Sequence, residues 1–131
     1  MKKRYAFLII FIVLVVAGII GFNVFSSTIV KKAYELENTR VDISKVSDGK
    51  YEGHSELGPV IVDVNVTVEA GKIVDVEIVR HDNGLGGKAN AIAEDIVKAN
   101  SYEVDAVSGA TVSSKVIMNA VNNALNKATN Y

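Results

Sequence analysis

The sequence predicts an α+β domain, in which an antiparallel sheet built on a β-hairpin has helices packed on one face, preceded by one N-terminal transmembrane helix. Three patterns predict this fold. They are a long uncharged stretch near the N-terminus, a central segment in which valines alternate with other residues, and two later segments with apolar residues at helical spacing. With 131 residues, the chain has room for one small domain and an anchor, but not for two hydrophobic cores.

The composition excludes several classes of function. The chain has no cysteine, which rules out disulfides, thiolate metal sites, covalent c-type haem and lipidation on cysteine. Its formal net charge is −1, so nothing indicates nucleic-acid binding. The two histidines, His54 and His81, have no cysteine or carboxylate cluster beside them, and the sequence therefore predicts no metal site.

The N-terminal segment, residues 1–30, is expected to be a membrane anchor. Residues 2–4 are basic, and an uncharged run from Tyr5 to Phe22 follows. About 20 mostly apolar residues in a helix are enough to cross a bilayer. A cleavable signal peptide is the alternative, although its apolar region is usually shorter. The basic N-terminus favours a cytoplasmic start and an extracytoplasmic domain. Residues 31–47 are polar and mixed, and we expect a juxtamembrane linker there.

The expected domain, residues 48–131, begins with strands. A short strand is expected at 50–54. From Val60 to Val68, valine occupies every second position, which is typical of a half-buried strand. Ala70-Gly71 then makes a turn, and residues 73–79 return as the second strand of a hairpin. The valine face must be covered, because a lone hairpin is barely stable in water.

Two helices are expected to provide this cover. Apolar residues recur at helical spacing in residues 88–99 and again in residues 113–128. Strands followed by helices along the chain indicate an α+β arrangement with an antiparallel sheet.

The stretch from Asp105 to Thr111, Asp-Ala-Val-Ser-Gly-Ala-Thr, lies between these two helices. Its small residues let backbone N–H groups approach a ligand, and the start of a helix offers unpaired donors with a partial positive charge. Both features favour an anion, and a phosphate above all. The alternative is an ordinary Ser/Thr-capped helix that follows a glycine turn.

This stretch resembles the flavinylation motif of the FMN-binding domain family. That family includes the C subunit of the sodium-pumping NADH:quinone oxidoreductase, the G subunit of Rnf complexes and small extracellular flavoproteins. The family pattern is Asp, a small residue, any residue, Ser or Thr, Gly, Ala, and Ser or Thr, and all seven positions match. The resemblance implies that Thr111 carries FMN through a phosphoester bond, installed from FAD by a separate flavin transferase. The neighbouring residues expected to contact the cofactor are Asp105, Ser108, Gly109, Ala110, Val112 and Ser113.

A glycine-rich segment lies between the predicted hairpin and the next helix. Many family members carry His, then Glu-Thr-Pro, then Gly-Leu-Gly in this place, lining the flavin. This chain keeps Gly84, Leu85 and Gly86 but has the shorter Asp82-Asn83 instead of Glu-Thr-Pro. The resemblance therefore implies a cofactor-binding role for the Gly-Leu-Gly residues, with Leu85 as an apolar wall. It extends over roughly residues 48–128.

The resemblance implies a membrane-anchored, extracytoplasmic electron carrier and not an enzyme, in which the protein positions FMN and the flavin carries the electrons. The donor would be a membrane flavoprotein dehydrogenase or quinol, and the acceptor would be extracytoplasmic. Two alternatives stay open. One is a subunit of a multi-subunit membrane redox complex, and the other is an unflavinylated, membrane-tethered binding or sensory module.

Overall fold

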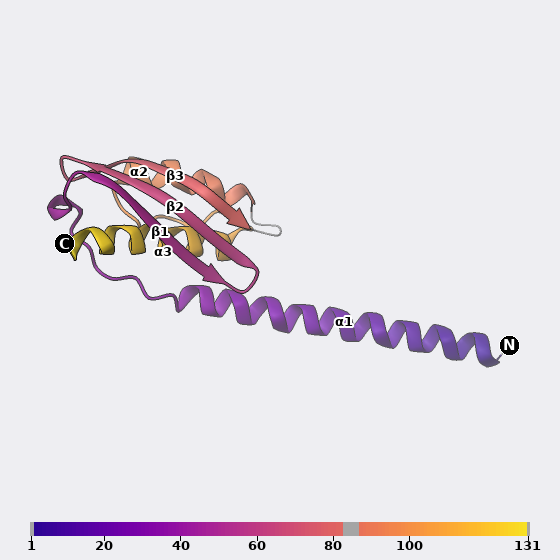
Figure 1. The fold of residues 1–131 in the computed structure, drawn as a ribbon. Coiled ribbons are helices and arrows are strands. Elements are labelled where there is room, and N and C mark those ends of the chain that lie inside the picture. Colours follow the sequence, from indigo (N-terminus) through magenta and orange to yellow (C-terminus); the bar gives the residue numbers. More distant parts are fainter. Residues whose placement is uncertain (1, 83–86, 131) are drawn as a thin grey trace.

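The computed structural model describes residues 2–82 and 87–130, and its elements form one sheet covered by helices (Figure 1). The helices are α1 (Lys2–Tyr34), α2 (Ile92–Ala99) and α3 (Thr111–Thr129), with two short 3₁₀ turns, η1 (Ile43–Lys45) and η2 (Gly87–Ala91). The strands are β1 (Gly49–Leu57), β2 (Val60–Glu69) and β3 (Lys72–Asp82). The strands pair antiparallel in the order β1-β2-β3, and α3 packs on β1 and β2 while α2 packs on β3. The predicted α+β fold is confirmed.

Two tight turns set the register of the sheet. Leu57 pairs with Val60, so the β1–β2 turn consists of Gly58 and Pro59 alone, with Gly58 at a φ of 56°. A positive φ at the first central position followed by the fixed negative φ of proline is the type II′ arrangement. In the β2–β3 turn, Ala70 and Gly71 have φ values of 49° and 72°, as a type I′ turn requires. The predicted hairpin is therefore confirmed.

The hydrophobic core lies between the sheet and the two helices. All five alternate valines of β2 are buried: Val60, Val62, Val64, Val66 and Val68. Facing them are the apolar stripes of the helices: Ile92 and Ile96 from α2, and Ile117, Val121 and Leu125 from α3. Gly53 of β1 faces α3 so closely that a Cβ at this position would lie 1.9 Å from the carbonyl oxygen of Ala120. Helix α3 therefore rests directly on the backbone of β1.

The boundaries of the elements differ from those predicted in several places. The strand expected at 73–79 is β3, which runs from Lys72 to Asp82 because it stays paired with β2. The strand expected at 50–54 runs from Gly49 to Leu57, because it pairs with β2 along its whole length. The helix expected at 88–99 is divided into η2 and α2, and such tighter winding is common where a helix begins. Helix α3 begins at Thr111, two residues before the expected start at Ser113, so the end of the Asp105–Thr111 stretch is itself helical.

Helix α1 is long and apolar enough to cross a membrane. A signal sequence near the N-terminus has the same length and composition. Its side chains from Tyr5 to Phe25 are exposed in the structure and pack on no other element. Figure 1 shows it extending away from the domain, with the N-terminus at its far end.

The segment after α1 lies against α3. Asn122 of α3 is 1% exposed; its Oδ1 accepts from the backbone N–H of Thr39 at 2.8 Å, and its Nδ2 donates to the Thr39 carbonyl at 2.6 Å. Asn119 donates from Nδ2 to the Glu37 carbonyl at 2.9 Å. At the end of α1, the ammonium of Lys115 lies 5.0 Å from the centre of the Tyr34 ring. These contacts join the apolar helix to the domain over the residues where the sequence indicates a linker.

Candidate functional site

The chain makes a tight turn just before α3. The N–H of Ala110 donates to the carbonyl of Val107 at 2.9 Å, which closes a four-residue turn with Ser108 and Gly109 at its centre. Gly109 has a φ of 76°, the left-handed value that a type II turn requires at this position. The glycine of the Asp105–Thr111 stretch therefore has a backbone conformation that a residue with a Cβ would adopt only under strain.

Helix α3 begins without a side-chain cap. Its N-cap residue is Ala110, whose methyl group cannot accept a hydrogen bond from the first turn. The first N–H groups of an α-helix have no partner inside the helix, and they carry the positive end of the helix dipole. At α3 these donors are the N–H groups of Thr111, Val112 and Ser113, for which the described part of the chain supplies no acceptor. They are available to an anionic ligand.

Ser114 fixes the turn to the helix. Its side chain is fully buried; its Oγ donates to the carbonyl of Ala110 at 2.7 Å and accepts from the N–H of Val107 at 3.0 Å. One hydroxyl thus holds both ends of the turn. From the sequence, Ser114 is a hydroxyl in the first turn of the helix, either part of an ordinary helix start or a secondary phosphate contact; its position does not reveal a contact back to the loop.

Three hydroxyls at this helix start, those of Ser108, Thr111 and Ser113, make no hydrogen bond within the described residues. Thr111 is partly exposed and Ser108 is exposed, and neither side chain makes a hydrogen bond with a residue that the structure describes. Ser113 is only 2% exposed, and its hydroxyl likewise has no partner within residues 2–82 and 87–130. Thr111 therefore presents an accessible oxygen directly beside the three free N–H groups.

Of the other predicted site residues, two lie in the described part of the chain and three lie outside it. Asp105 is exposed and precedes the turn, whereas Val112 is partly buried and packs against the core. The structure thus brings the residues from Ser108 to Ser113 together at the start of α3. Gly84, Leu85 and Gly86 lie outside the described residues, so their predicted contact with a cofactor stays a prediction.

A lysine that the sequence analysis did not select lies at the turn. Lys88 belongs to η2, which packs on α3, and a Cβ added to Gly109 would be 2.7 Å from the Lys88 Nζ and 3.3 Å from its Cε. The cation therefore lies directly over the Cα of Gly109. Twenty-odd residues separate the two positions, and only the packing of η2 against α3 brings them together.

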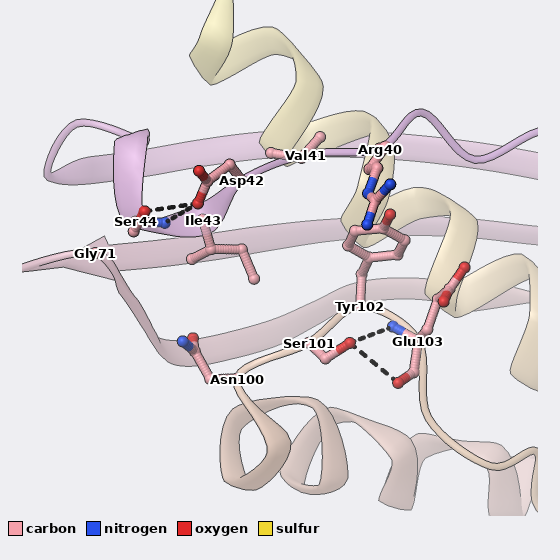
Figure 2. Close-up of a pocket in the computed structure, with 10 residues that line it drawn as sticks. All are labelled: Arg40, Val41, Asp42, Ile43, Ser44, Gly71, Asn100, Ser101, Tyr102 and Glu103. Carbon is pink, nitrogen blue, oxygen red and sulfur yellow. Dashed lines mark hydrogen bonds between the residues drawn. The ribbon is translucent and has the colours of Figure 1, made fainter.

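A pocket of about 390 Å³ lies elsewhere (Figure 2). It lies between the segment after α1 and the loop after α2, and Gly71 of the β2–β3 turn is part of its wall. Figure 1 places this turn at the end of the sheet opposite to the one where β3 ends and α3 begins. Some of its polar groups bond to one another: Ser44 to Asp42, and Ser101 to the backbone of Glu103. None of the predicted site residues lines it.

The histidines lie outside this arrangement of hydroxyls. His54 is exposed on β1, with its Nδ1 2.6 Å from Asp63 Oδ1, and the Nδ1 of His81 lies 2.6 Å from Asn90 Oδ1. Within the described residues, no group of three or more His, Cys, Asp or Glu side chains could hold a metal ion.

Comparison with known proteins assigns the chain to a family. A search of the curated proteins found no match. The family model described as the FMN-binding domain matches residues 58–126, which is more than half of the chain and includes β2, β3, α2, the whole Asp105–Thr111 stretch and most of α3. This match supports a flavin-binding role, and the free N–H groups and hydroxyls at the start of α3 lie inside it. The chain belongs to the FMN-binding domain family.

Proposed function

We propose that this protein carries FMN covalently on Thr111 through a phosphoester bond and acts as an electron carrier on the extracytoplasmic side of a membrane. The single observation that carries this proposal is the combination at Thr111. Its hydroxyl is accessible and has no hydrogen bond to a described residue, and it begins a helix that has no side-chain cap.

The residues at this helix start fit a phosphate group. The N–H groups of Thr111, Val112 and Ser113 are donors without acceptors, and an alanine at the N-cap leaves them so. A phosphate ester on the Thr111 oxygen would bring acceptor oxygens to these donors and negative charge to the positive end of the helix. Ser108 and Gly109, in the turn before the threonine, are both exposed.

The attachment reaction is a transfer of a phosphoryl-linked group with no change of oxidation state. The Thr111 oxygen forms a bond to the FMN-side phosphorus of FAD, and the bond from that phosphorus to the AMP oxygen breaks. AMP leaves, and the hydroxyl proton passes to a base of the flavin transferase. This protein is the substrate of that enzyme, and its own contribution is to present an unhindered hydroxyl on a fixed turn. Bound in this way, FMN supplies reversible electron transfer.

Membrane attachment is part of the proposal. Helix α1 has the length and composition of a membrane span, and residues 2–4 are basic, which favours a cytoplasmic N-terminus. In that orientation the FMN-binding domain is extracytoplasmic. It would receive electrons from a membrane flavoprotein dehydrogenase or from quinol and pass them to an extracytoplasmic acceptor.

The test is the intact mass of the full-length protein, produced together with a flavin transferase. We expect the wild-type protein to gain one FMN in phosphoester linkage, located by peptide mapping on the peptide that contains Thr111. The Thr111→Ala variant should gain none. The Thr111→Ser variant is the matched control and should keep the flavin, because it retains a hydroxyl at the same helix position.

Two outcomes would refute the proposal. An unmodified wild-type mass, from cells in which the transferase modifies a known substrate, would exclude the covalent link. A flavin that remains attached in the Thr111→Ala variant would place the link on another residue.

A further inference from the structure

The ammonium group of Lys88 lies beside Gly109, two residues before the proposed attachment residue. A Cβ built on Gly109 would lie 2.7 Å from Lys88 Nζ, so the cation is in contact with the backbone two residues before Thr111. Lys88 is held there by η2, a short turn in which Ala89 is fully buried in the core beside it. The lysine stem is thus anchored at its base, and the head lies over the turn.

Among the described residues, this cation has no acidic partner. The ion pairs of the described residues include six basic groups, and Lys88 is not among them; nor does it donate a hydrogen bond to any residue in the described ranges. A lysine free of an acidic partner, placed against a turn that precedes a helix start, adds a full positive charge to the partial charge of the helix dipole. Both charges act on the same small region.

The backbone conformation favours glycine at position 109. Its φ of 76° disfavours a side chain. A Cβ there would lie 2.7 Å from the Lys88 ammonium, which is the end of a flexible side chain and would have to shift. The glycine therefore leaves space for the lysine to approach the turn.

We infer that Lys88 is a positioning residue for the phosphate group carried by Thr111. Its ammonium pairs with a phosphate oxygen on the side of the turn, while the N–H groups at the start of α3 bind from the helix side. Lysine is a common phosphate ligand in proteins, where it acts as a point charge. This inference rests on the proposed flavin attachment and adds to it a side chain that the Asp105–Thr111 stretch does not contain.

The experiment compares full-length variants in detergent, incubated with purified flavin transferase and FAD. Lys88→Gln removes the charge, and Lys88→Arg keeps it. Lys98→Gln is the matched control, because Lys98 is an exposed lysine on α2 whose partner is Glu94, at 3.8 Å. The initial rate of FMN incorporation is followed by intact mass. We expect Lys88→Gln to be slowed by roughly tenfold, the scale of one hydrogen bond to a charged group. Lys88→Arg and Lys98→Gln should stay within about twofold of the wild-type rate.

A second readout distinguishes phosphate contact from recognition by the transferase. The ³¹P NMR signal of the flavinylated protein should shift in Lys88→Gln, prepared by long incubation, and stay in place in Lys98→Gln. Total loss of labelling in Lys88→Gln with recovery in Lys88→Arg would also support the inference. A wild-type rate, or an unchanged ³¹P signal, in Lys88→Gln would overturn it.

The two proposals can fail separately. If wild-type protein gains no flavin, the proposed function itself is wrong. If the wild type is labelled and Lys88→Gln behaves like it, only the role of Lys88 is wrong. The unfolding midpoint of the unlabelled Lys88→Gln protein should equal that of the wild type, since the side chain is exposed.

Discussion

Ser113 and Ser114 form a natural matched pair for testing how the turn before α3 is held. Both serines are buried in the first turn of α3, yet within the described residues only the side chain of Ser114 makes hydrogen bonds. In Ser114→Ala, the partly buried N–H of Val107 loses its acceptor, while the carbonyl of Ala110 keeps the N–H of residue 114 at 2.9 Å. A buried donor left unsatisfied costs about 1–3 kcal/mol. Because Val107 is only partly buried, we expect the lower half of that range.

Helix propensity opposes this loss by the same amount in both variants. Serine is less favourable than alanine inside a helix by roughly 0.5 kcal/mol. We therefore expect Ser114→Ala to lower the free energy of unfolding by about 1 kcal/mol. Ser113→Ala loses no hydrogen bond and should leave the free energy of unfolding unchanged or raise it by about 0.5 kcal/mol.

The assay is urea unfolding of the full-length variants in detergent, followed by circular dichroism. Hydrogen exchange at the Val107 amide gives a local check, and exchange should become faster only in Ser114→Ala. The effect on flavin attachment should differ from the effect on the free energy of unfolding. Ser113→Ala is expected to slow labelling of Thr111, because the hydroxyl of Ser113 has no hydrogen-bond partner among the described residues and is free to contact a phosphate. Equal unfolding free energies for the two variants would refute the assigned role of Ser114.

Two further predictions concern the packing that supports the site. Gly53→Ala would place a Cβ 1.9 Å from the Ala120 carbonyl oxygen, so α3 must move away from β1. We expect the free energy of unfolding to fall by about 1–3 kcal/mol, measured by urea unfolding. Glu52→Ala, at an exposed position, is the control. Asn122→Ala removes both hydrogen bonds to Thr39 and should release the segment after α1, seen as faster protease cleavage near residue 39, whereas unchanged cleavage would show that other contacts hold it.

The sequence contains enough to predict the sheet and the helices. Valine at every second position of β2 specifies which face of the strand is buried. A shift of the strand pairing by one residue would turn all five valines to solvent. Ala70-Gly71 marks the turn that joins β2 to β3. These signals are local, because period and turn chemistry are properties of neighbouring residues.

The long-range contacts of the candidate site could not be predicted in this way. Ser108, Gly109 and Thr111 are adjacent in the chain, so a short pattern finds them. Lys88 reaches Gly109 only because η2 packs on α3. The bonds from Asn122 to Thr39 join residues 83 positions apart, and an asparagine in an amphipathic helix carries no sign of such a partner. The spacing of residues along the sequence does not show which distant residues are in contact.

Hydrogen bonds from asparagine side chains join α3 to the segment after α1. They limit how far from the membrane anchor the domain of the proposed carrier can meet partners. Fully extended, residues 35–47 would span about 45 Å, which would let a tethered domain sweep a wide region above the bilayer. Because Asn119 and Asn122 bind this segment, most of its length lies against the domain. With α1 in a membrane, the domain would stay close to the lipid surface. A partner would then have to diffuse laterally to Thr111, so collision frequency would depend on partner density in the membrane.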